Sequence, residues 1–325
     1  MRLETGTGRR IELLQSIGDG GQGKVFHLNG DDAKVVKLYH QPSPKLQAKI
    51  QDLVDTPTDR RVPERFAAWP TDVVYEVSGP WFWRKRTFVG CLMPYIADSY
   101  PIFHMYTPKM QKKHNWRINW GHMHQLGHSL AELFSAFHDK GIVIGDVNSR
   151  NILANTSLAL TLIDVDSVQI SPQHTSDVGV EEYTPPELMK RSLKGLVRSE
   201  HHDLFGLGYL LFQLLMKGAS PFAGIAKVDL KAEHVEKRCK ELGIFPFFEN
   251  QFVAPPPGMP HVTIFHPQVA EGFFYCFIGG RKNPDLRPSA RTWLTKFGVA
   301  ERELIRCKRE REHVYSSHLR RCPWC

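Results

Sequence analysis

Two acidic residues and an amide residue stand in apolar surroundings near the middle of the sequence. Asp146 and Asn151 are five positions apart in a segment that begins Ile144-Gly145, and Asp164 follows eighteen positions after Asp146. Carboxylate and amide oxygens suit Mg²⁺, and a carboxylate that is not bound to metal can accept a proton from an alcohol. The alternative is that each side chain caps a short strand through an Asx turn. The pattern therefore indicates either a magnesium-dependent site on loops or a set of structural turns.

A glycine-rich segment followed by a lysine indicates a phosphate-binding loop. Gly18, Gly20, Gly23 and Val25 fit the pattern G-x-G-x-x-G-x-V, and Lys37 stands in the next apolar strand pattern. Glycines let a backbone approach phosphates closely, and a lysine inside an apolar strand needs a negative charge near its ammonium. The alternatives are an ordinary hairpin turn and a lysine whose ammonium reaches water. A dinucleotide-binding domain is disfavoured because a strand pattern, and not a helix, follows the third glycine.

The elements that must position these residues change in character along the chain. Short strand patterns dominate the first third, with one helix that begins at the cap Ser43-Pro44. Apolar residues then recur at three- and four-residue steps over 122–138, and a leucine-dense helix follows over 204–215. Helical patterning continues from there to the end. This order predicts an α+β fold, with a small antiparallel-sheet domain over 1–96 and a helical domain over 97–300.

Together these residues resemble the signature set of protein kinases, over about residues 9–299. The resemblance implies a bilobal fold with ATP between the lobes. It implies that Asp146 orients the substrate hydroxyl and accepts its proton, that Asn151 and Asp164 bind Mg²⁺, and that Lys37 holds the α- and β-phosphates. The implied reaction is transfer of the γ-phosphoryl group of ATP to a Ser or Thr hydroxyl of a protein, with the chain itself as one candidate substrate.

Further positions resemble supporting parts of the same family. The resemblance implies that Met93 to Tyr95 form the hinge that binds adenine, and that the glycine loop covers the ATP phosphates. Glu187 ends a segment similar to the family's A-P-E, and Arg287 resembles the late arginine that pairs with that glutamate. Asp203, which opens the leucine-dense helix, resembles the aspartate that supports the catalytic loop.

Several positions depart from the kinase pattern. Gly145 replaces the arginine that precedes the catalytic aspartate, Asp166 replaces the glycine of D-F-G, and Asn148 replaces a lysine. The first helix offers only Asp52 as an acid in place of the ion-pair glutamate, so the sequence assigns no partner to Lys37. Without that arginine, no arginine-paired phosphate switch is expected in the activation segment. These departures favour a second hypothesis, a nucleotide-binding pseudokinase scaffold.

Cysteine and histidine residues gather at the end of the sequence. Cys307, His313, Cys322 and Cys325 have the spacing C-x5-H-x8-C-x2-C, with His318 as a rival to His313. Two thiolates at C-x2-C spacing can share one tetrahedral ion, so we expect a structural zinc site. The alternative is a set of loose thiols on a basic tail.

The tail over 301–325 also carries much of the formal net charge of +8. Excess positive charge suits an acidic partner, although a solvated basic helix face is the simpler interpretation. A nucleic-acid-associated regulatory module that acts through this tail is therefore a third hypothesis.

Three short segments of the sequence resemble one group within the protein kinases. Ala68-Trp69-Pro70, the run over 163–169 and the terminal Cys-Pro-Trp-Cys are similar to bacterial kinases of the TerY-phosphorylation triad. That resemblance implies two partners, a PP2C-like phosphatase and a von Willebrand A-domain protein. Because the sequence stops on a candidate zinc ligand, we also expect the natural protein to be longer.

Bulk features complete the expectations. A run of about eighteen apolar residues, as a membrane helix needs, is absent, and the first residues do not form a secretion signal. We therefore expect a cytoplasmic protein. Cys91, Cys239 and Cys276 stand among apolar neighbours, and we expect them to be buried thiols.

Overall fold

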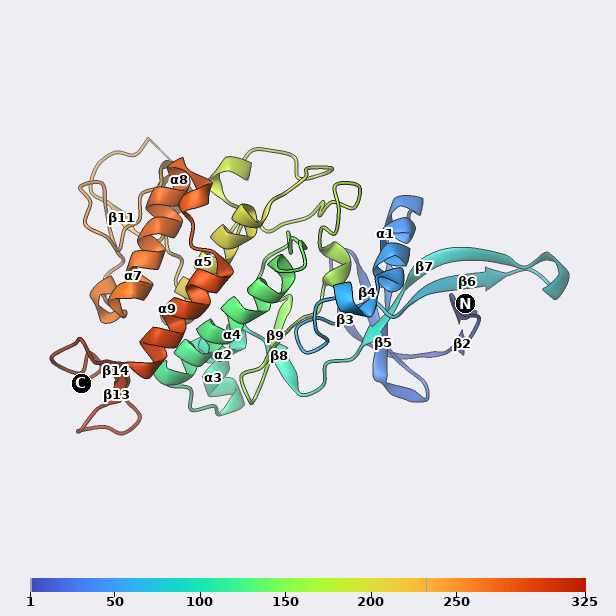
Figure 1. Ribbon diagram of the computed structural model, residues 1–325, viewed down its shortest axis with the longest axis horizontal. Helices are drawn as coiled ribbons and strands as arrows, with labels where there is room; N and C mark the ends of the chain where they lie inside the picture. The colour runs from blue at the N-terminus through green and yellow to red at the C-terminus, as the bar shows by residue number, and fades with distance from the viewer. Residues whose placement is uncertain (1, 232) are drawn as a thin grey trace. The chain divides into compact units, whose positions relative to one another are not determined.

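The computed structural model describes residues 2–231 and 233–325, and its contacts divide the chain into two units (Figure 1). The first unit comprises the residues up to Ser99 together with Thr161–Asp166, and the second comprises Tyr100–Leu160 together with Ser167–Cys325. The first is rich in strands and the second in helices, so the predicted α+β class is confirmed. The domain boundaries predicted at residues 96 and 300 stay predictions.

One antiparallel sheet forms the first unit, with the strand order β2-β1-β6-β7-β5-β4-β3. Its core consists of fully buried aliphatic side chains that include Leu28, Val36 and Val74. The predicted strands on both sides of the glycine loop are therefore present. The strands are β1 (Leu3–Thr5), β2 (Arg10–Ile11), β3 (Leu13–Asp19), β4 (Gly23–Leu28), β5 (Asp31–Tyr39), β6 (Asp72–Ser78) and β7 (Lys85–Pro94).

The helix of the first unit, α1 (Pro44–Asp55), begins where the sequence predicts it. The Ser43 hydroxyl accepts a hydrogen bond from the Leu46 amide at 3.2 Å. Pro44 stands at the first helical position, where its missing N–H costs nothing because an amide there has no acceptor within the helix. The indole of Trp69 donates to the Leu53 carbonyl at 2.8 Å. This bond ties the Ala68-Trp69-Pro70 segment to the helix.

The second unit is predominantly helical. Its longest helices are α4 (Trp120–His138), α5 (Glu200–Leu215) and α9 (Ala290–Arg302), of which α4 and α5 confirm the predicted helices. The other helices are α2 (Phe103–Tyr106), α3 (Pro108–His114), α6 (Val235–Leu242), α7 (Pro267–Phe274) and α8 (Gly280–Lys282). Short 3₁₀ turns are η1 (Thr58–Arg60), η2 (Trp81–Trp83), η3 (Val165–Ser167), η4 (Pro186–Leu188), η5 (Val262–Ile264) and η7 (Pro284–Leu286), and η6 (Tyr275–Gly279) is a π-helical turn. The remaining short strands are β8 (Ser99–Pro101), β9 (Ile152–Asn155), β10 (Leu160–Leu162), β11 (Ile225–Ala226), β12 (Val253–Ala254), β13 (Leu304–Arg306) and β14 (Val314–Ser316).

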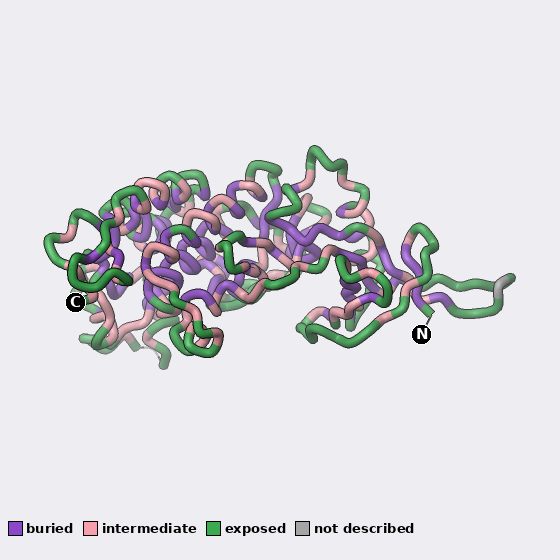
Figure 2. The backbone as a smooth tube through the Cα atoms, turned by 90° about the horizontal axis from the view of Figure 1, so that it is seen from below, coloured by how far each residue is buried: buried purple, intermediate pink, exposed green. Residues whose placement is uncertain are grey.

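Close packing of α9 on α4 explains one glycine of the second unit (Figure 1). A Cβ atom on Gly127 of α4 would lie 2.3 Å from the ring of Phe297 on α9, so only glycine allows this approach. Helix α5 is buried along nearly its whole length, as its leucine density predicts. The buried segments run through the interior of each unit, and many of the connecting loops are exposed (Figure 2). Within the described residues, every helix is too short or too polar to cross a bilayer.

The end of the chain differs from the predicted continuous helical pattern. Helix α9 ends at Arg302, and β13 and β14 then form an antiparallel hairpin in which Ile305 pairs with Tyr315. The Cys307 amide donates to the His313 carbonyl at 2.9 Å and closes the loop between the two strands. The prediction of helix here was wrong because these strands are only three residues long, too short to produce a recognisable alternating pattern.

Candidate active site

The glycine-rich loop connects β3 to β4. Gly18 pairs with Val25 across the hairpin, and the Gly20 amide donates to the Gly23 carbonyl at 3.0 Å. A Cβ atom on Gly23 would lie 2.3 Å from the Leu38 carbonyl oxygen of β5, so this close approach requires glycine. A Cβ on Gly18 would meet open space. The loop backbone is therefore uncovered on the side where Gly18 lies.

Lys37 lies in the middle of β5, opposite Val25 of β4. Its side chain is 8% exposed, and its Nζ lies 2.7 Å and 3.0 Å from the two carboxylate oxygens of Asp166. The same Nζ contacts Asp164 Oδ1 and lies 3.4 Å from Gln22 Oε1 of the glycine loop. The first unit thus brings the predicted Lys37 and Asp164 together, and it supplies a second carboxylate that the sequence did not assign.

The electrostatics of this cluster favour one ionised pair. Burial alone would lower the pKa of Lys37, but the charges of Asp166 and Asp164 outweigh it and raise that pKa. Burial alone would raise the pKa of Asp166, but the attraction of Lys37 lowers it. Burial and the neighbouring charge of Asp166 raise the pKa of Asp164 to about 7, although Lys37 opposes the change. Lys37 and Asp166 are therefore the firmly charged partners, and Asp164 is the carboxyl that protonates more readily.

The predicted hinge residues lie at the end of β7. Met93 is buried and pairs with Val35 of β5. The Tyr95 amide donates to the Ala33 carbonyl at 2.8 Å, and the Tyr95 ring packs edge-on against His27 at 4.7 Å between centroids. The structure therefore places Met93 inside the sheet and Tyr95 directly after the end of β7.

In the second unit, Asp146 and Asn151 are brought together by a short loop. The side-chain nitrogen Nδ2 of Asn151 donates to Asp146 Oδ2 at 3.1 Å. Asn148 builds the turn between them, since its Oδ1 accepts from the amides of Arg150, at 2.9 Å, and Asn151, at 3.2 Å. The asparagine that replaces the usual lysine thus shapes the loop backbone.

Asp203 of α5 binds the backbone at the start of this loop, at Ile144 and Gly145. Its carboxylate accepts from the amides of Ile144, at 2.7 Å, and Gly145, at 2.8 Å, and it lies 3.1 Å from His138 Nε2. Gly145 has φ of +74°, and a Cβ there would lie 2.3 Å from the Ser176 hydroxyl. Both facts exclude an arginine at this position, which explains the departure from the kinase pattern.

A different arginine reaches the same place from the segment after η4. The Arg198 guanidinium donates to the carbonyls of Gly145 and Val178, and the side chain is almost fully buried. The backbone of Arg198 is fixed by Gln169, which accepts from its amide at 2.8 Å and donates to its carbonyl at 2.8 Å. Arg198 therefore links the backbone at Gly145 to the backbone at Val178, in the stretch of chain that leads to Glu187 and that resembles the activation segment of kinases.

The predicted pair of Glu187 and Arg287 is present. Two parallel hydrogen bonds of 2.6 Å and 2.8 Å join the guanidinium to the carboxylate. Arg287 also donates to the carbonyls of His201, at 2.8 Å, and Gly280, at 2.9 Å. This network fixes the end of the activation segment to the helices of the second unit.

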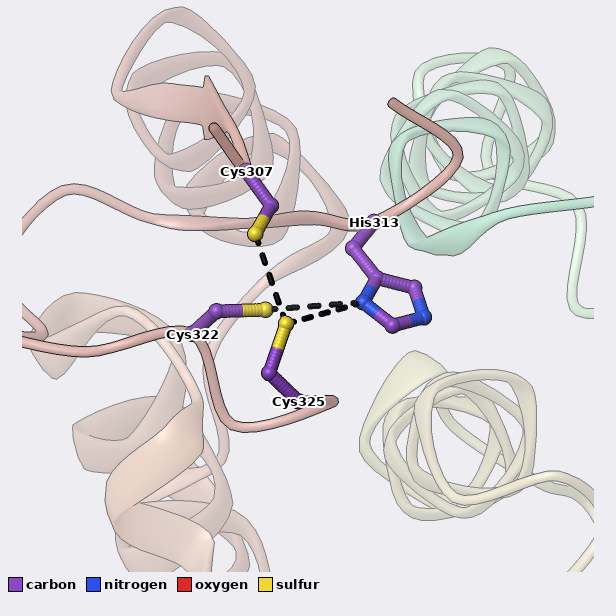
Figure 3. Close-up of side chains that lie close together, drawn as sticks. All are labelled: Cys307, His313, Cys322 and Cys325. Atoms are coloured by element: carbon purple, nitrogen blue, oxygen red, sulfur yellow. Dashed lines mark hydrogen bonds between the residues drawn. The ribbon is translucent and has the colours of Figure 1, made fainter. Parts of the chain in front are cut away.

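The terminal cysteines and His313 converge in three dimensions (Figure 3). The ligand atoms of Cys307, His313, Cys322 and Cys325 all lie within 4.8 Å of one another. Cys307 and Cys325 sulfurs are 3.5 Å apart, and His313 Nδ1 is 3.6 Å from the Cys325 sulfur and 3.7 Å from that of Cys322. His318 instead contacts the Ser316 hydroxyl at 2.8 Å, so His313 belongs to the cluster and its rival does not.

The sequence missed two residues of these sites, Asp166 and Arg198. Asp166 stood in the pattern only as a lost glycine, although its position two residues after Asp164 in an apolar run was a signal. Arg198 carried no local signal, because it meets Gly145 across 53 positions of sequence.

Known proteins are similar to this chain in sequence and in fold. The protein kinase domain family matches residues 82–292. "Protein kinase YegI" of Escherichia coli (strain K12) is 29% identical over 332 residues, which cover 100% of this chain and 50% of that protein. "Probable serine/threonine-protein kinase CPE1738" of Clostridium perfringens (strain 13 / Type A) is 25% identical over 243 residues, or 71% of this chain and 32% of that protein. The chain thus spans about half the length of YegI.

A solved structure shows the fold. The "ROP18 kinase domain in complex with AMP-PNP and sucrose" matches with a TM-score of 0.61 at 16% identity, over 92% of this chain and 82% of that chain. The antiparallel sheet of the first unit and the helices of the second agree with that likeness, which confirms the predicted kinase fold. Because the family match also extends over more than half of the sequence, the chain belongs to the protein kinase family.

Proposed function

We propose that the chain is an ATP- and magnesium-dependent protein kinase that transfers the γ-phosphoryl group to a Ser or Thr hydroxyl. The observation that carries the proposal is the loop in which Asn151 Nδ2 donates to Asp146 Oδ2 at 3.1 Å. Asp203 holds the start of this loop by accepting from the amides of Ile144 and Gly145. A base needs a fixed carboxylate, and this loop supplies one. The name of the Clostridium perfringens relative, "Probable serine/threonine-protein kinase CPE1738", supports the choice of hydroxyl.

In this proposal the residues act as follows. The substrate hydroxyl oxygen attacks the γ-phosphorus, its proton passes to the Asp146 carboxylate, and the bond from the γ-phosphorus to the β–γ bridging oxygen breaks to release ADP. Lys37 binds the α- and β-phosphates, and the loop of Gly18, Gly20 and Gly23 covers them with backbone amides. Met93 and Tyr95 mark the hinge that receives adenine.

The donor set suits magnesium. Asp164 and Asn151 offer carboxylate and amide oxygens, the hard ligands that Mg²⁺ prefers. The Asn151 Nδ2 donates to Asp146, which fixes the orientation of its side-chain amide. When bound, the ion would neutralise charge on the phosphates. The protein's own part is to hold these oxygens in place.

The proposed function is tested by incubating the full chain with γ-labelled MgATP and a generic protein substrate, followed by phosphoamino-acid analysis. Label on Ser or Thr of the substrate or of the chain itself supports the proposal. Label on Tyr alone would contradict the Ser/Thr assignment. Binding of MgATP without any transfer would instead favour the pseudokinase scaffold, which the replaced D-F-G glycine and catalytic-loop lysine support.

We also propose that the terminal cluster binds structural zinc. Ligand atoms of a tetrahedral zinc ion, roughly 2.3 Å from the metal, lie about 3.7 Å apart, and the separations of 3.5, 3.6 and 3.7 Å in the cluster agree with that value. Backbone amides of Glu310 and Arg309 lower the pKa of Cys307 to about 7, which favours the thiolate form that zinc requires.

The zinc proposal has a matched pair of variants. His313→Asn should lose zinc, whereas His318→Asn, which changes a histidine only five positions away, should retain it. Metal content of the purified proteins, measured by mass spectrometry, distinguishes them. Equal zinc content in the two variants would contradict the ligand assignment.

The remaining sequence predictions stay proposals. The resemblance to TerY-triad kinases implies a PP2C-like phosphatase and a von Willebrand A-domain protein as partners. The cytoplasmic location, expected from the sequence pattern alone, is a separate proposal. The basic residues of 301–325 keep a nucleic-acid contact as an alternative. A salt-dependent gel shift that disappears when 301–325 are removed would support that alternative.

A further inference from the structure

Asp166 is a buried carboxylate of the first unit to which the proposed reaction gives no role. Asp166 is 3% exposed, and both of its oxygens contact the Lys37 ammonium. A carboxylate in the protein interior is costly unless it is paired and hydrogen-bonded. Lys37 is the cation that the described contacts give to Asp166, and the pair is closer to a bidentate arrangement than the single contact of Lys37 with Asp164.

Two neutral side chains, those of Tyr39 and Cys91, also interact with Asp166. The Tyr39 hydroxyl lies 3.3 Å from the Cys91 sulfur, and both side chains are buried beside Lys37. Burial, followed by the charge of Asp166, raises the pKa of Cys91 to about 12, and the same causes raise that of Tyr39. The cationic partner that the described contacts give to Asp166 is therefore the Lys37 ammonium, 2.7 Å and 3.0 Å from its two oxygens.

The carboxylates that hold Lys37 come from a single short segment. Asp164 and Asp166 flank Val165, which is 1% exposed and fixes the segment in the core. In helix α1, by contrast, the Asp55 carboxylate accepts from Gln51 at 2.9 Å. In the kinase pattern a helix glutamate pairs with the lysine. Here Asp166, two positions after the proposed magnesium ligand Asp164, makes the ion pair with Lys37.

We propose that Asp166 is a positioning residue that anchors the Lys37 ammonium in place of a helix glutamate, and so leaves Asp164 for magnesium. The inference rests on the proposed function. An ammonium group has three N–H donors. Asp166 keeps its share of these donors when nucleotide binds, while the contacts with Asp164 and Gln22 are exchanged for phosphate oxygens. Movement of α1 therefore does not switch the position of Lys37.

The test measures MgATP affinity of the full chain by calorimetry, together with KM for ATP and kcat for transfer. Asp166→Asn should weaken MgATP binding and raise KM at least tenfold, with a smaller decrease in kcat. The matched control is Glu4→Gln, which removes another buried carboxylate of the first unit, 3.3 Å from Arg2. It should leave MgATP affinity within twofold of the wild type.

A double-mutant cycle separates anchoring from general damage to the fold. In a Lys37→Met background, Asp166→Asn should change MgATP affinity by less than twofold, because Asp166 acts through Lys37. An equal loss in both backgrounds would overturn the inference. So would an increase in activity on Asp166→Asn, which would make the pair inhibitory.

The helix variants keep the inference testable even if Asp166→Asn does not fold. Asp52→Asn and Asp55→Asn should each leave MgATP affinity within twofold, and a tenfold loss in either would place the anchor on α1 and overturn the inference. Wild-type MgATP binding that needs Asp166, without phosphate transfer, would refute the active kinase alone. A wild-type chain that binds no MgATP would overturn both proposals.

Discussion

Replacement of Arg287 measures how strongly a buried ion pair stabilises the second unit. The Arg287 side chain is 0% exposed, and it makes hydrogen bonds of 2.6 Å and 2.8 Å to the Glu187 carboxylate. It also donates to two carbonyls and lies over the Phe205 ring at 5.4 Å. Arg287→Ala removes all of these contacts at once.

The magnitude follows from what the substitution leaves behind. The Glu187 carboxylate, 28% exposed, would lose its cation and remain partly desolvated. Breaking a buried pair by removing one partner costs about 3–5 kcal/mol. The surface pair of Arg291 with Asp139 has similar geometry, at 3.1 Å and 2.8 Å, but the arginine is 73% exposed. Such exposed pairs contribute about 0–1 kcal/mol, so Arg291→Ala is the matched control.

The assay is hydrogen exchange of the α5 amides, which reports on the second unit without assuming that the whole chain unfolds in one step. Arg287→Ala should lower the opening free energy of these amides by about 3–5 kcal/mol, and Arg291→Ala should lower it by less than about 1 kcal/mol. Equal effects of the two substitutions would refute the argument that burial decides the strength of the pair.

Three further predictions concern the second unit. Gly127→Ala should lower its unfolding free energy by about 1–3 kcal/mol, because the new Cβ would lie 2.3 Å from the Phe297 ring, whereas Gly298→Ala on α9 has room and should change it by less than about 1 kcal/mol in a urea titration. Burial lowers the pKa of His124 to about 4, below the value of 6.5 of the unfolded chain. The free energy of unfolding is therefore highest above pH 6.5 and decreases as pH falls towards 4, because the unfolded chain binds the proton first. His124→Phe should remove about 3 kcal/mol of this decrease, and an unchanged pH dependence between pH 7 and 4 would contradict the argument. Arg198→Ala should speed tryptic cleavage of the activation segment at least tenfold (about 1.4 kcal/mol or more), while phosphatase treatment of the wild type leaves its kinase activity unchanged; activity lost on phosphatase treatment would show that a phosphate, and not Arg198, holds the segment.

Local signals allowed much of the fold to be predicted. The cap at Ser43, the periodicity of α4 and the leucine density of α5 each depend on residues close in sequence, and the structure has these helices. The pairing of Glu187 with Arg287 followed from the kinase resemblance, because that pattern carries a long-range contact that periodicity cannot give.

The sequence failed where a contact joins distant segments without a motif. Asp166 was interpreted as the loss of a flexible glycine, although it is the gain of a carboxylate 129 positions from Lys37. Arg198 meets Gly145 across the activation segment for the same reason. In the tail, the structure has the short hairpin of β13 and β14 where helical patterning was expected, and these strands are too short to give a clear alternating pattern.

Transfer of labelled phosphate from MgATP tests the central claim most directly. The wild-type chain is compared with Asp146→Ala, which removes the proposed base, and with Asp164→Ala, which removes a proposed magnesium ligand. The account predicts incorporation by the wild type that both substitutions abolish, while Glu4→Gln retains it. Incorporation that survives Asp146→Ala and Asp164→Ala would contradict the proposed roles, and its absence from the wild type would contradict the proposed kinase activity.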